Sequence, residues 1–236
     1  MDTSNPIDPS YTNATAIIDS DHAAIIEYAQ KAVSGKDDDP LSKAVALYYA
    51  VRDGIRYDPY YPFYRPAHYR ASAVLASGHG YCVSKASLLC ALGRAQNIPT
   101  RIGFATVRNH LTTKQLHERM GSDLFVYHGY TEFFLEGKWV MATPAFNATL
   151  CQRHQVAPLE FNGREDSIFQ PFNKENKKYM EYVSYLGTYA DVPVATIVAA
   201  WQETYGHERV ARWIDDLENA RPDSRRDFYT EDVVKN

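Results

Sequence analysis

The chain has 236 residues, a formal net charge of −4 and no long basic runs, which argues for one sizeable buried core and against nucleic acid as a partner. Three cysteines, at positions 82, 90 and 151, are an odd number and do not suggest a disulfide framework. The longest apolar run, Val192 to Trp201, is about half of the ~20 residues that a membrane span needs, and no signal peptide is visible. We therefore expect a soluble, cytoplasmic protein with no membrane partner.

Two helices are predicted after a polar arm over residues 1–20. Asp21 is a candidate N-cap for a helix from His22 to about Val33. Asp39 followed by a proline predicts a second helix start, and apolar residues at helical spacing continue to about Asp53. Both helices are expected to cover the core.

An aromatic loop is predicted next, between Tyr57 and Tyr69. Prolines interrupt it and exclude a regular helix. Its rings either pack onto the core or form the wall of a groove for a substrate or a hydrophobic partner. We favour packing onto the core. The aromatic residues of this loop are Tyr57, Tyr60, Tyr61, Phe63, Tyr64 and Tyr69.

The stretch around Cys82 is the most informative part of the chain. Gly78 and Gly80 permit a sharp turn before the cysteine, and a mostly apolar run follows it to Gly93. This pattern predicts a buried central helix with Cys82 at its start. Unpaired N–H groups and the positive end of the helix dipole at this position favour a reactive thiolate. The alternative is that Cys82 is a small buried apolar residue.

A β-hairpin is predicted after this helix and a first strand over residues 100–107. Glu136 and Gly137 form a two-residue turn between strands 124–135 and 138–143. Counting from the turn pairs residue 132 with 141 and residue 130 with 143, so His128 and Thr143 share one face as diagonal neighbours. Glu132 is about 13 Å along the strand from His128 at ~3.3 Å per residue, too far to orient its ring.

The region after the hairpin carries weaker signals. Residues 145–190 are rich in turn formers, and helices are predicted over 194–205 and 207–218, separated by Gly206. An apolar stripe on the first of them must bury against the core. The stripe consists of Ile197, Val198, Trp201 and Tyr205. We expect one domain over residues 1–236, made of the arm, a core over 21–146 and an extension over 147–236.

The motifs around the cysteine and the hairpin resemble those of the transglutaminase-like superfamily, in a member of the bacterial type. The stretches that carry the resemblance are Gly80-Tyr81-Cys82, Ile98-Pro99-Thr100-Arg101, His128-Gly129-Tyr130-Thr131-Glu132, Gly137-Lys138-Trp139-Val140 and Thr143-Pro144. The resemblance implies an α+β fold with a papain-like core, in which a helix bearing the cysteine packs on an antiparallel sheet bearing the histidine. It covers residues 40–146 and leaves 150–236 unexplained.

The resemblance assigns Cys82 as the nucleophile and His128 as the general base. The aspartate that usually follows in the family falls on Thr143, whose hydroxyl can orient the ring but brings no charge. In a Ser-His-Asp enzyme, neutralising the aspartate costs about 10⁴ in rate. Asn147 is a second candidate for this orienting position, since Cys-His-Asn arrangements exist.

The resulting functional hypothesis is a cysteine hydrolase or acyltransferase that attacks an amide, peptide or thioester-like carbonyl through an acyl-enzyme. Superfamily members are peptidases, amidases, transglutaminases and peptide N-glycanases, so the partner would be a peptide, a protein or an amide-containing small molecule. The N–H of Cys82 and a tyrosine of the 57–69 loop are candidate oxyanion donors. The alternative is a catalytically silent peptide-binding module on the same fold. No cofactor or metal is expected, because no close His and Cys ligand spacing occurs.

Overall fold

The computed structural model describes residues 7–109, 112–169, 180–219 and 226–232. The α-helices are α1 (Ala23–Val33), α2 (Pro40–Gly54), α3 (Ala71–Ser77), α4 (Cys82–Ala95), α5 (Lys114–Met120), α6 (Ala148–Arg153), α7 (Val194–Tyr205) and α8 (His207–Glu218). The strands are β1 (Arg56–Tyr57), β2 (His79–Gly80), β3 (Thr100–Asn109), β4 (Leu124–Leu135), β5 (Lys138–Ala142) and β6 (Met180–Tyr189). Short 3-10 turns are η1 (Pro9–Tyr11), η2 (Pro66–His68) and η4 (Phe228–Thr230).

A four-stranded antiparallel sheet with the order β5-β4-β3-β6 forms the scaffold of the molecule. The predicted hairpin is confirmed, with Leu135 opposite Lys138 and Glu132 opposite Met141 across the turn. Glu136 and Gly137 both have positive φ, as a tight two-residue turn requires. The ladder ends at Ala142, one residue before Thr143, so the last pair of the predicted register is not part of the sheet.

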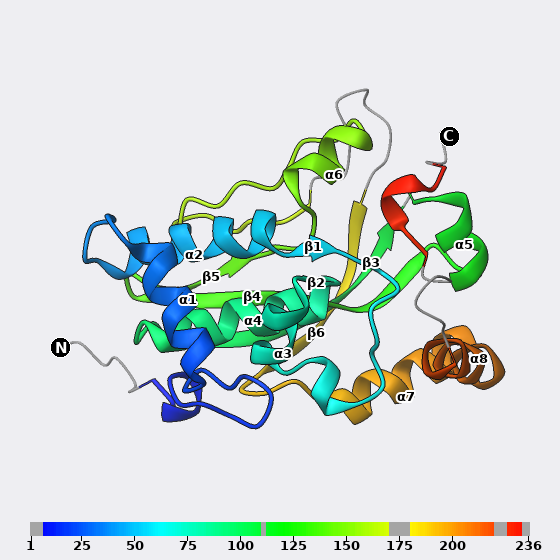
Figure 1. Ribbon diagram of the computed structural model, residues 1–236, viewed down its shortest axis with the longest axis horizontal. Coiled ribbons are helices and arrows are strands. Elements are labelled where there is room, and N and C mark those ends of the chain that lie inside the picture. The colour runs from blue at the N-terminus through cyan, green and yellow to red at the C-terminus, as the bar shows by residue number, and fades with distance from the viewer. Residues whose placement is uncertain (1–6, 110–111, 170–179, 220–225, 233–236) are drawn as a thin grey trace.

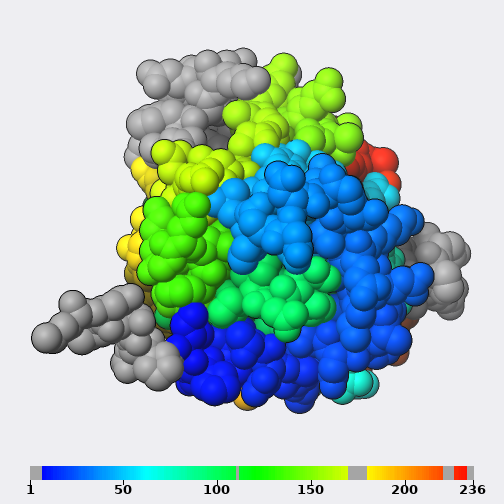
Figure 2. All heavy atoms as spheres, turned by 90° about the vertical axis from the view of Figure 1, so that its left-hand side faces the viewer, coloured from blue at the N-terminus to red at the C-terminus, as the bar shows by residue number. Residues whose placement is uncertain are grey.

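Helix α4 packs along one face of this sheet and is almost completely buried (Figure 1). Thr131 of β4 donates a hydrogen bond to the Ala86 carbonyl of the helix, and Phe133 packs where Gly93 leaves room for its ring. Helices α1, α2 and α3 surround α4 on its other sides. Figure 2 shows the end of α4 between the N-terminal helices and the β4–β5 hairpin. This central helix therefore holds Cys82 in a fixed position against the sheet.

The opposite face of the sheet carries a second apolar cluster, and His128 lies on this side. The cluster contains Tyr130 and Met141 of the hairpin and Phe169 from the segment after α6. The His128 ring lies 5.4 Å from the Phe169 ring, centroid to centroid. His128, Tyr130 and Met141 thus share a face, as the hairpin count predicts.

The C-terminal helices pack on the same core as the N-terminal ones. Ile197 is fully buried, the Trp201 indole N–H donates to the Val126 carbonyl, and the Tyr205 hydroxyl both accepts from Val126 and donates to Leu124. Trp201 also packs on Phe63 of the aromatic loop. The predicted burial of the apolar stripe is confirmed.

Several local predictions need correction. The N-cap of α1 is His22 and not Asp21, because the His22 ring accepts from the Ala24 N–H. Strand β6 and helix α6 lie within the region 145–190, where no regular structure was predicted. The strand forms because it pairs with the free edge of β3, which lies far from it in the sequence. Among the described residues, every helix is too short or too polar to cross a bilayer.

Candidate active site

Cys82 is the first residue of α4, as predicted. Gly78 ends α3 in the left-handed region with φ 70°, and the Tyr81 N–H donates to the Ser84 side chain to cap the new helix. A side chain at Gly80 would collide with the same Ser84 hydroxyl. Cys82 itself is only partly buried, whereas Cys90, two turns along the helix, is fully buried. The turn therefore presents one thiol at the helix start.

An irregularity in β4 sets the direction of the His128 side chain. The β3–β4 register shifts between Ala105 and Val107, and Tyr127 takes a positive φ of 58° immediately before His128. Such bulges re-aim side chains next to functional sites. Gly129 follows, and a Cβ there would lie 2.7 Å from the Val83 Cα. The strand and the first turn of α4 can approach this closely only because residue 129 is a glycine.

Cys82 and His128 line one small cavity of about 60 Å³, which we call the inner cavity. Its wall is mostly aromatic and comes from the 57–69 loop, β4 and the C-terminal helices. The aromatic lining residues are Tyr57, Tyr60, Tyr61, Phe63, Tyr81, Phe125, Tyr127, Trp201, Tyr205 and Trp213. The favoured prediction, packing onto the core, holds for Tyr57, Phe63 and Tyr69, which are buried, and Tyr57 and Phe63 line the cavity as well.

Burial shifts the pKa values of both Cys82 and His128. Burial raises the pKa of the Cys82 thiol to about 11, although the backbone N–H groups of Gly129, Val83 and Cys82 itself favour the thiolate. Burial also lowers the pKa of His128 to about 4. Removal from water thus opposes the thiolate that the N–H groups at the helix start favour, and it favours a neutral imidazole at His128.

Among the described residues, the buried polar atoms without a hydrogen-bond partner of good geometry include His128 Nε2, the hydroxyl of its neighbour Tyr182, and the hydroxyl of Thr143, which lies near Tyr182. The Tyr182 ring lies 6.4 Å from the His128 ring, edge to face. Burial raises the pKa of Tyr182, and the nearby Thr143 hydroxyl and Phe169 backbone oppose that rise. Buried polar atoms are rarely left unpaired, so this cluster calls for a functional explanation or a bound water.

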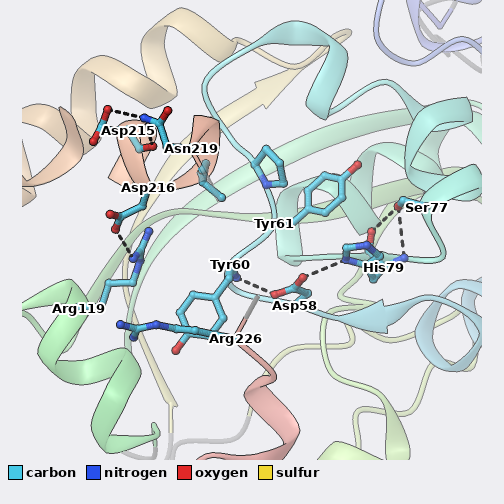
Figure 3. A pocket seen from close by; sticks show the side chains of 12 residues that line it. Asp58, Tyr60, Tyr61, Ser77, His79, Arg119, Asp215, Asp216, Asn219 and Arg226 are labelled. Atoms are coloured by element: carbon cyan, nitrogen blue, oxygen red, sulfur yellow. Dashed lines mark hydrogen bonds and ion pairs between the residues drawn. The ribbon is translucent and has the colours of Figure 1, made fainter. Parts of the chain in front are cut away.

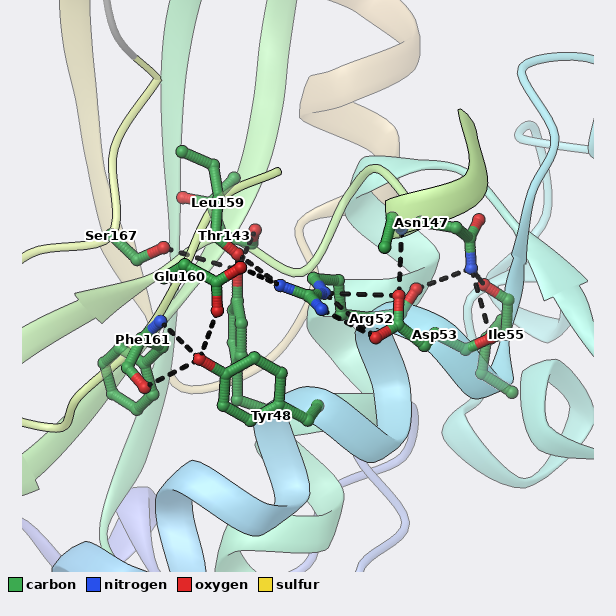
Figure 4. A network of polar contacts seen from close by, with 12 residues as sticks. Tyr48, Arg52, Asp53, Ile55, Thr143, Asn147, Leu159, Glu160, Phe161 and Ser167 are labelled. Carbon is green, nitrogen blue, oxygen red and sulfur yellow. Dashed lines mark hydrogen bonds and ion pairs between the residues drawn. The ribbon is translucent and has the colours of Figure 1, made fainter. Parts of the chain in front are cut away.

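The alternative orienting residue, Asn147, is used elsewhere (Figure 4). Its side-chain oxygen accepts from the Tyr57 N–H and the Tyr229 hydroxyl, and its amide donates to the carbonyls of Arg52 and Ile55. All its hydrogen-bonding capacity is spent on joining β1 to the end of α2. It cannot also hold the His128 ring.

Glu132 is likewise committed to another partner, as expected from its distance along the strand. Its carboxylate forms an ion pair with Arg101 of β3. The Tyr60 hydroxyl donates to Glu231 at 2.6 Å, which removes this phenol from the candidate oxyanion donors of the aromatic loop.

Sequence reasoning missed the contributions of β6 and α7 to the site. Tyr182 reaches His128 because β6 pairs with β3, and Trp201 and Tyr205 close the cavity from α7. Tyrosines and β-branched residues over 180–189, without a strict period of two, were a weak signal for β6. Among the described residues, no group of three or more His, Cys, Asp or Glu side chains could hold a metal ion.

The chain is similar to known proteins in structure and in sequence profile. A solved structure of a candidate cysteine protease from Cytophaga hutchinsonii is similar over 76% of this chain, with 16% sequence identity and a TM-score of 0.43. The present chain spans about half of that protein, 53% of its length. No curated protein matches significantly in sequence. The profile of the transglutaminase-like superfamily matches residues 26–144, which include Cys82, His128 and the hairpin, and the chain therefore belongs to that superfamily.

Proposed function

We propose that the protein is a cysteine-dependent hydrolase or acyltransferase that acts on an amide, peptide or thioester carbonyl, with Cys82 as nucleophile and His128 as general base. The observation that carries this proposal is that both side chains line one inner cavity, at the start of a buried helix and beside a strand bulge. A peptide, a protein or a small amide is the expected substrate. The chain is proposed to act as a single domain, with helices α7 and α8 completing the cavity wall.

The reaction begins from the neutral pair. His128 takes the proton of the Cys82 thiol as the sulfur attacks the carbonyl carbon, and the carbonyl oxygen becomes an oxyanion. N–H groups at the start of α4 are positioned to stabilise this charge. The imidazolium then gives its proton to the departing amine or thiolate, which leaves an acyl group on Cys82. Water or an amine attacks this thioester after losing a proton to His128, and the thiol is restored.

The position that orients the His128 ring, which an aspartate usually fills in the family, is proposed to be occupied by hydroxyl groups. His128 Nε2 and the hydroxyls of Thr143 and Tyr182 are buried and unpaired among the described residues, and the two hydroxyls are proposed to bond to Nε2, directly or through a water, when substrate binds. Burial lowers the pKa of His128, and no carboxylate among the described residues opposes that shift. The imidazolium is therefore stabilised less than in an enzyme with aspartate at this position.

The neutral state of Cys82 and His128 also favours a second candidate function, that of a catalytically silent module that binds peptides. Burial raises the pKa of the Cys82 thiol and lowers that of His128, and both shifts oppose proton transfer from the thiol to the imidazole in the free protein. Binding without turnover is the outcome expected of that candidate.

Mass spectrometry of the intact protein after exposure to a panel of peptide thioesters and activated amides tests the proposal. An acyl adduct at Cys82 is expected in the wild type and in Cys90→Ala, whose thiol lies buried on the same helix. Cys82→Ala should remove the adduct, and His128→Asn should slow its formation at least about 100-fold. Saturable binding of peptides with no adduct and no turnover would instead favour the binding module.

A further inference from the structure

The inner cavity adjoins a larger outer basin of about 730 Å³ on the surface. The residues that line both mark the junction between them: Tyr60, Tyr61, Arg119 and Leu217. Figure 3 shows this junction, with Arg119 and Arg226 on the side of the Tyr60 ring. A substrate that reaches Cys82 from the basin passes these side chains.

Arg119, in the last turn of α5, brings a permanent positive charge to this junction. Its guanidinium lies 5.7 Å from the Tyr60 ring centroid and 5.6 Å from that of Trp213, so two rings restrict its position. Its side chain is only 16% exposed. Partly desolvated guanidinium groups bind carboxylates more strongly than exposed ones, since water competes less for their N–H donors.

The partner that Arg119 has in this structure is easily replaced. Arg119 bonds to Asp216 of α8 through one nitrogen at 3.1 Å, and the Asp216 side chain is 63% exposed. Ion pairs of this exposed kind contribute about 0–1 kcal/mol. A guanidinium has five N–H donors, and Asp216 is its acceptor among the described residues. Several donors therefore remain for a ligand.

A second guanidinium lies beside Arg119 and adds positive potential at this point, since Arg226 lies 5.6 Å from the Tyr60 ring. The basin is also lined by three carboxylates: Asp58 pairs with His79, Asp215 accepts from the Asn219 amide, and Asp216 pairs with Arg119. The carboxylate of Asp216 already marks the position that a ligand carboxylate can take.

We propose that Arg119 is a carboxylate-binding subsite, and that the substrate carries a carboxylate on the basin side of the carbonyl that Cys82 attacks. This inference rests on the proposed function of Cys82 and deepens it by naming a substrate class. The ligand carboxylate displaces Asp216 or uses the remaining donors of Arg119. The aromatic walls beside Cys82 contact the apolar part of the same molecule, which extends from the inner cavity to the basin.

Two matched reagents test the subsite: bromoacetyl-phenylalanine and its C-terminal amide, which differ only in the carboxylate. Both alkylate a thiol with loss of bromide, so the ratio of their rates at Cys82 reports the preference for the anion. The ratio is measured by mass spectrometry in the wild type, Arg119→Gln, Arg119→Lys, Asp216→Asn and Asp215→Asn, with circular dichroism as the fold control. Asp215→Asn removes the same charge from a neighbouring residue that does not bond to Arg119.

The acid should react faster than the amide in the wild type, and Arg119→Gln should lower the ratio about tenfold. Asp216→Asn should raise the ratio more than Asp215→Asn does, because it removes the competing carboxylate. Arg119→Lys should retain part of the preference. A ratio that Arg119→Gln and Asp216→Asn leave unchanged, with Cys82 still labelled, would overturn the subsite alone. Failure of both reagents to label Cys82 would overturn the proposed function and the subsite with it.

Discussion

Two polar clusters lie on either side of the first turn of α4, and they differ in how their hydrogen bonds are satisfied. In the first, Asn147 donates to the carbonyls of Arg52 and Ile55 (Figure 4). Lys85 donates to the same two carbonyls. Lys85 is fully buried, and burial holds its pKa well below the usual range. This cluster joins helix ends and strands, and its buried side chains find partners.

The second cluster, around Cys82 and His128, leaves buried nitrogen and hydroxyl atoms unpaired. Leaving such atoms unpaired costs about 1–3 kcal/mol each, so a purely structural cluster would not be expected to keep them. We interpret the first cluster as one that stabilises the fold and the second as one whose polar atoms are available to a ligand or a proton. The following predictions test this interpretation, from the largest expected effect to the smallest.

Removal of residues 190–236 is expected to have the largest effect. The truncation exposes the surface under Ile197 and removes the bonds that Trp201 and Tyr205 make to β4. We predict an insoluble or strongly destabilised product, measured by solubility and thermal unfolding. A soluble remnant with a cooperative unfolding transition would show that the C-terminal helices form a separate unit and that the proposed single domain is wrong.

Asn147→Ala tests the satisfied cluster. It leaves the Tyr57 N–H and the Tyr229 hydroxyl without their acceptor, so we expect the free energy of unfolding to fall by about 2–4 kcal/mol. Thr143→Val is the matched variant in the other cluster, because it removes a hydroxyl that has no good partner at nearly constant volume. It should change stability by less than about 1 kcal/mol. Equal losses in urea unfolding would show that the two clusters do not differ as proposed.

His128 makes stability depend on pH in a defined window. The pKa of His128 is about 4 in the folded protein, below its ordinary value of 6.5. Between about pH 4 and pH 6.5 the unfolded chain therefore binds one more proton at this residue than the folded protein does. Stability therefore falls as the pH falls from about 6.5 to about 4, by about 3 kcal/mol for this residue. His128→Asn should flatten that part of the curve.

His154 is a matched comparison, since burial lowers its pKa to about 4 as well. It is more exposed than His128, so His154→Asn should flatten the curve less. Urea unfolding at pH 7, 5.5 and 4 measures both variants. Parallel curves for wild type and His128→Asn would mean that the ring is not desolvated in the folded protein.

Local sequence signals were sufficient for the parts of the site that depend on neighbouring residues. The turn glycines and the apolar run placed Cys82 at a helix start, and the two-residue turn fixed the hairpin register that places His128. The position of Tyr182 depends on which strand pairs with the free edge of β3, and no local pattern specifies that choice. The burial that opposes the Cys82 thiolate was likewise not visible in the local sequence, because it depends on rings contributed by distant segments.

The smallest effects are expected at the hydroxyl groups beside His128. If Thr143 and Tyr182 hold the Nε2–H of the ring, Thr143→Val and Tyr182→Phe should each slow acylation of Cys82 by up to about tenfold, the value of one neutral hydrogen bond. Because the two hydroxyls would act in one network, the double variant should lose less than the product of the single effects. Stability should change little, which separates this positioning role from a structural one.

Thr143→Asp sharpens the same test by supplying the charge that this site lacks. A carboxylate beside the imidazole favours its protonated form and raises the pKa of His128 from about 4, although the buried carboxylate pays its own desolvation cost. The thiolate–imidazolium pair then becomes more accessible, so the pH dependence of Cys82 alkylation should move to lower pH. The rate of alkylation by iodoacetamide, followed from pH 5 to 10 in the wild type, Thr143→Val, Tyr182→Phe and Thr143→Asp, measures this shift. Four superimposable profiles would show that neither hydroxyl acts on the pair, and that His128 works without an orienting side chain.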